Sequence, residues 1–330
     1  MALQALVYGL DTSDVSDNDG RALFVNAQYH ERFSSQVDCV QWFKPYATHL
    51  SDHEVFQRIE DVDQSYDVIY LLVPKNMIEA RYLIARSLQI LEQGGDLFCA
   101  CENQSGGKRL QKIMQQFNAE IVQQISKYKS RFVQVKNNDV DITFVENSIL
   151  EGCVQSIDKI NFISQPGVYG WNKIDVGSAI LAQHVPQDLK GNIADFGCGY
   201  GFLLQHILQQ NDRVKTAYAI DADARALHVA DQNLDDKRAD YLWMDLRQAS
   251  NIPAKLDAII MNPPFHEGKK TDSGIGADFI RVAAKSLKRN GALYMVANNQ
   301  LPYEAVLNDV FFNVEVLAQQ NGFKVFKAVV

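Results

Sequence analysis

Asn262-Pro263-Pro264-Phe265 combines two hydrogen-bond acceptors, a rigid backbone and an aromatic ring. The side-chain oxygen of Asn262 and the carbonyl oxygen of Pro263 can accept both hydrogens of an amine conjugated to a planar group. Such an amine becomes pyramidal, and its otherwise delocalised lone pair can attack an electrophile. The prolines fix the carbonyl by locking φ, and Phe265 can stack on an unpaired base. We therefore interpret Asn262, Pro263 and Phe265 as catalytic residues, the alternative being a strand that ends at prolines before a buried aromatic residue.

A glycine turn could hold a ligand beside this centre. Asp195-Phe196-Gly197-Cys198-Gly199-Tyr200-Gly201 follows a strand-like run and precedes the helix-like stretch 202–207. Glycines let the backbone approach a ligand at the carboxyl end of a strand, where open α/β sheets bind. The dinucleotide fingerprint has Gly or Ala at its sixth position, whereas Phe202 stands there and the third glycine comes one residue early. The spacing argues against a nicotinamide site, and a structural turn is the remaining alternative.

Two aspartates directly follow predicted strands at the edge where this ligand would lie. Asp221 ends the second strand, at about the distance from the glycine turn at which a carboxylate accepts both ribose hydroxyls in doubly wound nucleotide sites. Asp245 ends the third strand. Asp223 and Asp240 have similar surroundings, so a solvated loop carboxylate is the alternative for each aspartate.

These residues need an α/β sheet to bring them together. In the second half of the chain, strand-like runs over 192–196, 216–220, 241–243, 256–261 and 292–296 alternate with helix-like stretches. This alternation predicts a mainly parallel, doubly wound sheet. Two further strands, over 314–317 and 324–329, can form an antiparallel hairpin at the sheet edge through a turn over 318–323.

The two halves of the chain read alike at an offset of about 195 residues. The strand-like runs 66–71 and 256–261 correspond, as do the glycine turns 94–98 and 290–294 and the strand exits 102–104 and 298–300. We also align Tyr128-Lys129 with Phe323-Lys324. The pattern predicts duplicated α/β domains over 1–150 and 151–330, with a linker near Asn147 to Ser164.

Length and composition bound the class of protein. The chain has 330 residues, 47% of them hydrophobic, which is enough for two domains with a buried core each. It has no signal-peptide pattern at its start and no run approaching the roughly 20 apolar residues of a membrane span. Its five cysteines form no Cys-x-x-Cys pair, which argues against a disulfide framework or a zinc site. We therefore expect a cytoplasmic monomer with neither a membrane nor a metal partner.

The formal net charge of −8 argues against indiscriminate binding of nucleic acid. A local exception runs from Lys108 to Lys136, where the only acid is Glu120. Its basic residues form a candidate phosphate-contacting surface and are Lys108, Arg109, Lys112, Lys127, Lys129, Arg131 and Lys136. An ordinary solvated face is the alternative.

The motifs together resemble the bacterial 16S ribosomal RNA guanine-N2 methyltransferases of the type called small-subunit methyltransferase C. The resemblance covers essentially the whole chain and rests on the stretches 195–201, 262–268, 166–169 and 175–178. It implies two tandem Rossmann-like class I methyltransferase domains with S-adenosylmethionine as cofactor. The implied reaction is methylation of the N2 amine of a guanine in 16S rRNA of the small ribosomal subunit, in helix 34.

The resemblance also implies roles for individual residues. It assigns to cofactor binding Asp195, Gly197, Gly199, Gly201, Asp221 and Asp245, the last as the acceptor for the adenine amine. Tyr169, Asp175 and Ser178 would lie over the cofactor, although Asp175 could equally be only a helix N-cap. The positive sulfur already activates the methyl donor, so positioning supplies most of the catalysis. No role follows for Trp171 and Lys173.

The first half departs from these motifs. Leu72-Val73-Pro74-Lys75 replaces the Asn-Pro-Pro-Phe tetrapeptide, and the stretch 23–28 near the first strand has no glycine string. We predict a catalytically silent domain that by resemblance supports folding and recognises RNA. The predicted RNA contacts are Lys108, Arg109, Lys112, Lys127, Lys129 and Arg131, together with Lys269 and Lys270 beside the active site.

Rival functions remain open at this point. Adenine-N6 and protein glutamine-amide methyltransferases share the tetrapeptide, so only the duplicated architecture favours guanine. A non-catalytic RNA-binding or assembly factor could keep the fold, but Asn262 and the intact glycine turn argue against it. His266 could move the departing proton, and an interfacial histidine explains it equally well.

Overall fold

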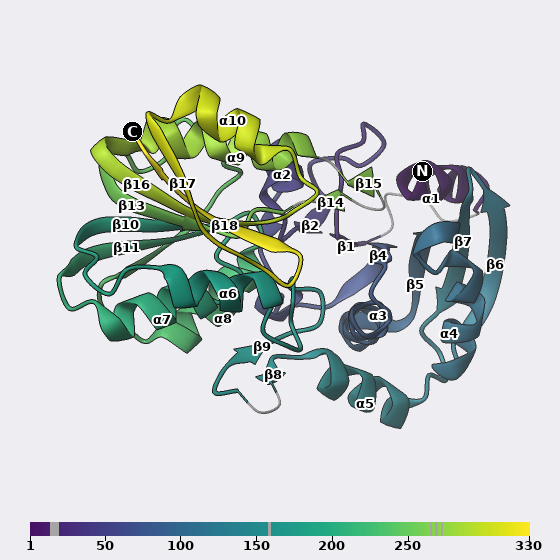
Figure 1. Cartoon of the computed structure of the whole chain (residues 1–330). Coiled ribbons are helices and arrows are strands. Elements are labelled where there is room, and N and C mark those ends of the chain that lie inside the picture. Colours follow the sequence, from purple (N-terminus) through teal and green to yellow (C-terminus); the bar gives the residue numbers. More distant parts are fainter. Residues whose placement is uncertain (14–19, 158–159, 265, 268–269, 272) are drawn as a thin grey trace. The chain divides into compact units, whose positions relative to one another are not determined.

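Residues 1–13, 20–157, 160–264, 266–267, 270–271 and 273–330 are described by the computed structural model, and of residues 266, 267, 270, 271 and 273 only the backbone is described. The chain forms two units (Figure 1). Unit 1 comprises Met1–Val154 and Gln165–Gly167, and unit 2 comprises Gln155–Ser164 and Val168–Val330. The linker expected between Asn147 and Ser164 therefore contains the end of a unit 1 helix and a short strand pair of unit 2.

Each unit contains a seven-stranded sheet within the described ranges, and the two sheets share one strand order. The order is β3-β2-β1-β4-β5-β7-β6 in unit 1 and β12-β11-β10-β13-β16-β18-β17 in unit 2. The last two strands of each sheet run antiparallel to their neighbours, and the other pairs are parallel. The predicted fold class, a mainly parallel doubly wound sheet with an antiparallel edge hairpin in each half, is confirmed.

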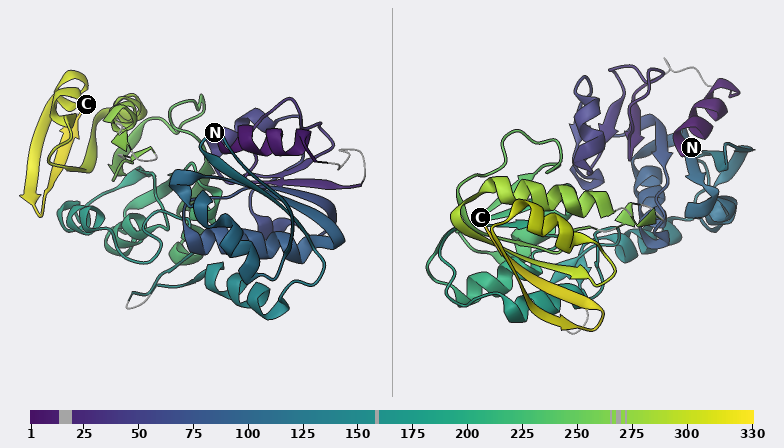
Figure 2. Two further views of the ribbon diagram at one scale, coloured as in Figure 1. Left: turned by 90° about the vertical axis from the view of Figure 1, so that its right-hand side faces the viewer. Right: turned by 45° about the horizontal axis from the view of Figure 1, so that its top comes forward.

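Unit 1 contains sixteen described elements up to residue 152. Its strands are β1 (Ala22–Val25), β2 (Asp38–Val40), β3 (Val55–Phe56), β4 (Tyr66–Leu72), β5 (Leu91–Glu102), β6 (Glu120–Lys127) and β7 (Ser130–Lys136). Its helices are α1 (Ala2–Asp11), α2 (Lys44–Ala47), η1 (Thr48–Leu50), η2 (Ile59–Asp61), α3 (Met77–Ile90), η3 (Asn103–Ser105), η4 (Gly107–Arg109), α4 (Leu110–Gln116) and α5 (Ile142–Gly152). Helix α1 lies against the sheet of unit 1 (Figure 2). Its Leu6 and Leu10 share a cluster of buried residues with Phe24, Phe98 and Phe132 of the strands.

Unit 2 follows the alternation predicted from its sequence. Its sheet strands are β10 (Gly191–Phe196), β11 (Val214–Asp221), β12 (Ala239–Trp243), β13 (Leu256–Met261), β16 (Leu287–Asn298), β17 (Asn313–Gln320) and β18 (Phe323–Val329). Its helices are α6 (Val176–His184), α7 (Phe202–Gln210), α8 (Ala224–Leu234), α9 (Ser273–Ser286) and α10 (Tyr303–Val310). Two short pairs, β8 (Gln155–Ser156) with β9 (Ile163–Ser164) and β14 (His266–Glu267) with β15 (Lys270–Thr271), complete it.

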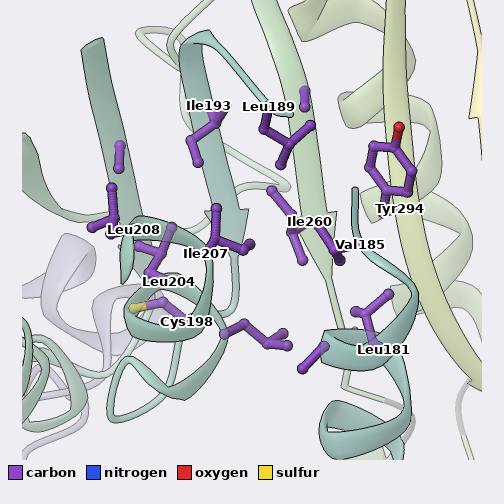
Figure 3. Packing of buried hydrophobic residues seen from close by; sticks show 14 of the residues in the cluster. Leu181, Val185, Leu189, Ile193, Cys198, Leu204, Ile207, Leu208, Ile260 and Tyr294 are labelled. Carbon is purple, nitrogen blue, oxygen red and sulfur yellow. The ribbon is translucent and has the colours of Figure 1, made fainter. Parts of the chain in front are cut away.

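Alternation along the strands of unit 2 divides its core into two layers. On one face, Leu181 of α6 and Leu204 and Ile207 of α7 pack with Ile193 and Ile260 of the central strands (Figure 3). The opposite face of the same strands packs against α9 and α10 (Figure 1). Truncating one such buried side chain to alanine typically costs about 2–5 kcal/mol. The central strands that carry the candidate site residues are thus held from both sides.

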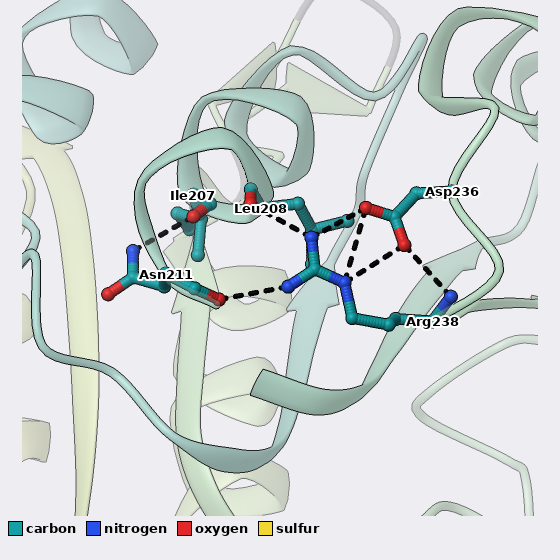
Figure 4. A network of polar contacts seen from close by, with 5 residues as sticks. All are labelled: Ile207, Leu208, Asn211, Asp236 and Arg238. Carbon is teal, nitrogen blue, oxygen red and sulfur yellow. Dashed lines mark hydrogen bonds and ion pairs between the residues drawn. The ribbon is translucent and has the colours of Figure 1, made fainter. Parts of the chain in front are cut away.

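The carboxyl end of α7 is tied to the sheet by a polar network (Figure 4). Arg238 donates to the carbonyl oxygens of Leu208 and Asn211, each at 2.9 Å, and pairs with Asp236. The side chain of Asn211 donates to the Ile207 carbonyl oxygen at 2.8 Å. The last carbonyls of a helix lack partners within the helix, so these bonds fix the end of the helix that begins at the glycine turn.

The duplication extends to the way in which the first strand of each sheet begins. Gly191 has φ +74°, and the side chain of Asp257 accepts a bond from the next N–H, that of Asn192, at 2.8 Å. In unit 1, Gly20 has φ +103°, and Asp67 accepts from the N–H of Arg21 at 2.8 Å. Both units therefore lock the start of their first strand to the fourth strand in the same way.

The turn of the edge hairpin in unit 2 is shorter than predicted. The expected turn over 318–323 is wrong in extent, because β17 continues to Gln320 and only Asn321 and Gly322 separate it from β18. Both have positive φ, as a type I′ turn requires. Tyr128 and Lys129 occupy this turn in unit 1, so they correspond to Asn321 and Gly322, and the alignment of Tyr128-Lys129 with Phe323-Lys324 is two residues out of register.

Candidate active site

The candidate site lies at the carboxyl ends of β10 and β13, which are neighbours in the sheet of unit 2. The strand order reverses here, because β11 lies on one side of β10 and β13 on the other, and open α/β sheets bind ligands at such a switch point. Asp195 pairs with Ile260, and Asn262 lies two residues further along the chain. Side chains two residues apart in a strand share a face. The topology thus brings Asp195 and Asn262 to one edge and one face.

The glycine turn holds a conformation that requires its glycines. Gly197, Gly199 and Gly201 have φ of +84°, +54° and +89°, in the left-handed region. The N–H groups of Gly197 and Cys198 donate to the Ile220 carbonyl oxygen at 2.8 and 3.1 Å, which ties the turn to β11. A Cβ atom built on Gly197 or Gly199 would meet no described atom within 4 Å. The turn therefore presents bare backbone to a space that a ligand can occupy.

Asp195 has a buried carboxyl group that finds no hydrogen-bond partner among the described residues. Its side chain has no exposed surface, and none of the described residues donates a hydrogen bond to either of its oxygens. Burial, reinforced by the charge of Asp221, raises the pKa of Asp195 to about 8. Native proteins rarely leave a buried polar group unsatisfied, so this carboxyl marks the place where a ligand with hydrogen-bond donors is expected.

Asp221 connects the second strand to the glycine turn. Its Oδ2 accepts from the N–H of Gly199 and its Oδ1 from the N–H of Asp223, each at 2.9 Å. Burial raises the pKa of Asp221 to about 6 against the opposing effect of these backbone hydrogen bonds. Its position at the end of β11 agrees with the predicted ribose-binding place, and the ribose contact itself stays a prediction.

Asp245 forms an ion pair with Arg247, which the sequence did not predict. Its Oδ1 accepts from the backbone N–H of Arg247 at 3.0 Å and forms an ion pair with the Arg247 guanidinium at 3.2 Å. The carboxylate is 7% exposed. A carboxylate can accept about four hydrogen bonds, so the predicted bond from the adenine amine is compatible with this pair.

The side chain of Asn262 is oriented by the N-cap residue of α6 and by a residue of its first turn. Its amide nitrogen donates to Oδ1 of Asp175 at 2.7 Å and to the hydroxyl of Ser178 at 2.9 Å. Because both N–H groups are used, the opposite branch of the amide, Oδ1, remains as an acceptor. Asp175 also caps α6 by accepting from the N–H of Ser178 at 2.9 Å. Asp175 thus has the predicted capping role, and the predicted cofactor contacts of Asp175 and Ser178 stay predictions.

Two tyrosines lie close enough to Asp175 for its charge to act on their hydroxyl groups. Tyr169 is 67% exposed, and partial burial together with the charge of Asp175 raises the pKa of its hydroxyl. Tyr200 donates to the Lys173 carbonyl oxygen at 3.2 Å and stacks edge-on against Phe162. Tyr169 therefore has the accessibility that its predicted place over the cofactor requires. Pro263 is buried behind Asn262.

Three predicted site residues cannot be placed in this geometry. Phe265 and Lys269 lie outside the described residues, and of Lys270 only the backbone in β15 is described. The same limit applies to the side chain of His266.

Strand register identifies what unit 1 has at the corresponding positions. Phe24 stands for Asp195, Asn26 for Gly197, Gln41 for Asp221 and Leu72 for Asn262. Gln41 is fully buried and donates to the Ala27 carbonyl oxygen at 2.6 Å, while Asn26 donates to the Leu72 carbonyl oxygen at 2.8 Å. Residues 26–37, all of them described, contain no helix, although α7 follows the first strand of unit 2. Unit 1 therefore lacks the carboxylates, the glycine turn and the helix of the candidate site.

The basic stretch of unit 1 divides in the structure. Exposed Lys108 and Arg109 in η4 follow the carboxyl end of β5, and the Lys129 carbonyl oxygen accepts from the N–H of Asn103 at this same end, at 2.9 Å. Lys127 and Arg131 flank the turn at Lys129, and exposed Lys112 follows in α4. Lys136, at the other end of β7 from this turn, pairs with Asp96 in the middle of β5. Lys108, Arg109 and Lys129 therefore lie near the carboxyl end of β5, whereas Lys136 does not.

Two absences can be stated for the described part of the chain. No helix there is both long and apolar enough to cross a membrane. Likewise, no three or more His, Cys, Asp or Glu side chains among the described residues group closely enough to hold a metal ion.

Comparison with known proteins agrees with this geometry. The family model described as methyltransferase small domain matches residues 159–327, and its N-terminal companion matches residues 8–138. Ribosomal RNA small subunit methyltransferase C of Yersinia pseudotuberculosis serotype IB is 30% identical over 268 residues, which cover 80% of this chain and 75% of the relative. The protein of the same name from Psychromonas ingrahamii is 27% identical over 269 residues, 81% of this chain and 77% of the relative.

A solved structure has the same fold. The T. thermophilus 16S rRNA N2 G1207 methyltransferase, determined in complex with AdoMet and guanosine, superimposes with a TM-score of 0.77 at 19% identity and covers 99% of this chain and 91% of its own. Fold, glycine turn and family models define a methyltransferase with a Rossmann-like catalytic unit. Within this class the chain belongs to the ribosomal RNA small subunit methyltransferase C family, a family of S-adenosylmethionine-dependent rRNA methyltransferases. The family predicted from the motifs is confirmed.

Proposed function

We propose that this protein transfers a methyl group from S-adenosylmethionine to the exocyclic N2 amine of a guanine in 16S rRNA of the small ribosomal subunit, in helix 34 as the resemblance implies. The main support is the amide of Asn262, whose N–H groups are held by Asp175 and Ser178 so that Oδ1 is turned out as an acceptor. The T. thermophilus structure, that of a 16S rRNA N2 G1207 methyltransferase in complex with guanosine, supports the same acceptor.

The residues around the glycine turn fit the cofactor. The partnerless carboxyl of Asp195 can accept hydrogen bonds from a ligand, and the bare backbone at Gly197 and Gly199 leaves room for it. Gly201, Asp221 and Asp245 complete the proposed binding set, and Tyr169 would cover it. When bound, S-adenosylmethionine supplies a methyl group already activated by a positive sulfur.

The reaction centre then has a positioning task. Oδ1 of Asn262 and the carbonyl oxygen of Pro263 accept the two N–H groups of the guanine amine and direct its lone pair to the methyl carbon, with Phe265 as the proposed stacking ring. In the proposed transfer the amine nitrogen would gain the methyl group as its bond to sulfur is lost, and the surplus proton would leave the nitrogen for water. A strong base is not needed, because alignment of the reacting atoms lowers the barrier.

We assign the halves different tasks. Residues 151–330 form the catalytic domain. Residues 1–150, which lack the site residues at the corresponding positions, recognise RNA and support folding. The proposed RNA contacts are Lys108, Arg109, Lys112, Lys127, Lys129 and Arg131, with Lys269 and Lys270, which follow the Asn-Pro-Pro-Phe tetrapeptide in the sequence.

The test is methyl transfer from labelled S-adenosylmethionine to 16S rRNA and to small ribosomal subunits, followed by analysis of the modified nucleoside. We expect N2-methylguanosine. Asn262→Ala should lower the rate about 10²–10³-fold, the range for loss of one positioned hydrogen-bond partner, with unchanged affinity for the cofactor. Asn308→Ala, a substitution of an exposed asparagine in α10, is the matched control and should have the wild-type rate.

The alternative functions give different products. N6-methyladenosine or a methylated glutamine would overturn the guanine assignment, and cofactor binding without any methyl transfer would indicate a non-catalytic factor. Wild-type turnover by Asn262→Ala would exclude the proposed reaction centre.

A further inference from the structure

A cavity of about 220 Å³ lies in unit 1, which the proposed chemistry does not use. Three segments distant in the sequence line it, namely α1, the stretch after β1 and the β6–β7 turn. The lining residues are Gln4, Val7, Tyr8, Asp11, His30 and Tyr128. Pockets for drug-sized ligands measure roughly 300–1,000 Å³, so this cavity suits a single planar ring system.

The cavity has aromatic walls beside a positive charge. The rings of Tyr8 and Tyr128 meet edge to face with centroids 6.2 Å apart. The ammonium of Lys127 lies 3.3 Å from the Tyr8 centroid and 5.3 Å from that of Tyr128. Tyr128 is 44% exposed. Tyrosine faces next to a cation are the surfaces on which proteins stack the bases of single-stranded nucleic acid.

Polar groups on the remaining lining residues offer both donors and acceptors. Nδ1 of His30 accepts from the N–H of Arg32 at 3.2 Å, so the neutral ring carries its hydrogen on Nε2. Asp11 contributes a carboxylate, paired with Arg32 at 2.8 Å, and Gln4 contributes an amide. A nucleobase edge presents the same mixture of donors and acceptors.

The turn that places Tyr128 is built from residues that its geometry disfavours. Tyr128 and Lys129 have φ of +52° and +54°, whereas a type I′ turn favours Asn-Gly. Unit 2 has Asn321 and Gly322 at the corresponding turn. Strained backbone in a sparsely populated region is concentrated at functional sites. A tyrosine and a lysine at these positions therefore point to a task for their side chains.

We propose that this cavity binds one unpaired nucleobase of the RNA substrate, stacked on Tyr128, with Lys127 and Lys129 at the adjoining phosphates. The inference rests on the proposed function, in which the methyl acceptor belongs to RNA. A polynucleotide fits better than a free nucleotide, because exposed Lys108 and Arg109 continue the positive charge along the same edge of the sheet.

The test grafts the turn of unit 2 onto unit 1 by Tyr128→Asn with Lys129→Gly. The thermal midpoint should stay or rise, because Asn-Gly suits the turn. Affinity for a short single-stranded oligoribonucleotide should fall by about 5- to 150-fold, the range for loss of one stacked base. The slope of log K against log salt should fall by about 0.7, because Lys129 no longer neutralises a phosphate.

Two single substitutions serve as controls. Tyr128→Phe keeps the ring in the same turn and should retain most of the affinity. Tyr46→Ala removes a tyrosine of similar exposure, 43%, from α2 of the same unit and should bind RNA as the wild type does. A fully paired duplex of the same sequence should lose only the lysine contribution in the grafted variant.

Wild-type RNA affinity in the grafted variant, or an equal loss for single-stranded and duplex RNA, would overturn the inference. These outcomes are separable from failure of the proposed function. If the wild type methylates rRNA and the grafted variant does so with an unchanged KM for RNA, only the base site is excluded. If the wild type does not methylate rRNA, the proposed function fails whatever the variant binds.

Discussion

One carboxylate oxygen, Oδ1 of Asp175, accepts from both the amide of Asn262 and the N–H of Ser178. It therefore begins a helix and orients the amide that would hold the substrate amine. Hydrogen bonds to an ionised acceptor are shorter and stronger than neutral ones, so Asp175 fixes the amide better than a neutral residue would. The two tasks can be separated by choosing the replacement side chain.

Asp175→Ser keeps a good N-cap but is too short to reach Asn262, whereas Asp175→Asn keeps both an N-cap and an acceptor of the same length. We expect Asp175→Ser to lower kcat by up to about 100-fold, because a misplaced reacting group can cost this much, with the thermal midpoint and cofactor affinity nearly unchanged. Asp175→Asn should keep most of kcat. Steady-state kinetics and calorimetry check this, and a loss of cofactor affinity instead would assign Asp175 to the cofactor.

The pKa values of Asp195 and Asp221 predict a pH-dependent affinity. Burial raises them to about 8 and about 6, so both carboxyls are partly protonated near neutral pH in the cofactor-free site. A ligand whose donors bond the ionised forms must displace these protons. Affinity for S-adenosylmethionine should therefore rise with pH between about 6 and 8, by up to about tenfold per unit for Asp195. In Asp195→Asn the dependence in this range should flatten, and parallel profiles for the two proteins would refute the assignment.

At the scale of elements, the glycine turn after β10 can be compared with the turn between β17 and β18, which also has a glycine in the left-handed region. Gly199 and Gly322 both have positive φ, and a Cβ atom on either would meet no described atom within 4 Å. Alanine at either position should cost about 1–2 kcal/mol of stability through the left-handed backbone. Only Gly199→Ala should also weaken cofactor binding, by about 10- to 200-fold, the effect of one extra carbon in a fitted site. Calorimetry on both variants measures the difference, and equal affinities would mean that the ligand does not approach Gly199.

The elements of unit 2 were largely predictable because their signals are local. Alternation of strand-like and helix-like runs and the glycine turn give the bounds of β10 and β13 to within one residue, and those of β11 and α7 to within three. The hairpin turn was misplaced because the run before Asn321 is weakly apolar, although Asn-Gly is itself a strong turn signal. The Asp175–Asn262 bond spans 87 residues and was not predictable, because nothing in the spacing fixes which polar groups meet.

In unit 1, too, the sequence did not predict which distant side chains come together. Missing motifs predicted that it lacks a catalytic site, and register identifies Gln41 and Leu72 as the residues at the corresponding positions. The cavity between α1 and the β6–β7 turn was missed, because Tyr8 and Tyr128 come together only in the folded sheet. The basic stretch in the sequence also includes a residue that does not join the others in the structure, since Lys136 lies at the end of β7 away from the Tyr128-Lys129 turn and pairs with Asp96.

At the scale of the whole molecule, RNA binding and cofactor binding should be separable by mutation. Reversal of Lys108 and Arg109 to glutamate should weaken RNA binding and lower its salt slope by about 0.7–0.9 for each phosphate that is no longer neutralised, because fewer counterions are released. Cofactor affinity should stay the same, since the candidate cofactor residues all belong to unit 2. The control is a second double reversal, Lys237→Glu with Lys255→Glu, at two exposed positions of unit 2, which changes the net charge by the same amount. An unchanged salt slope in the double reversal of Lys108 and Arg109 would make the surface an ordinary solvated face.

The partnerless carboxyl of Asp195 also has a consequence for folding. In the unfolded chain this carboxyl has a pKa near 3.9 and is ionised at neutral pH, whereas in the cofactor-free fold its pKa is about 8. Folding therefore takes up a proton, and the free energy of unfolding should fall as pH rises from about 4 to 8, by on the order of 1 kcal/mol per unit for this group. Asp195→Asn removes the proton uptake, so its Tm should exceed that of the wild type by a margin that grows towards pH 8. Saturating cofactor should close this gap, so the contribution of Asp195 to the stability of the cofactor-free protein is least favourable on the alkaline side of neutrality.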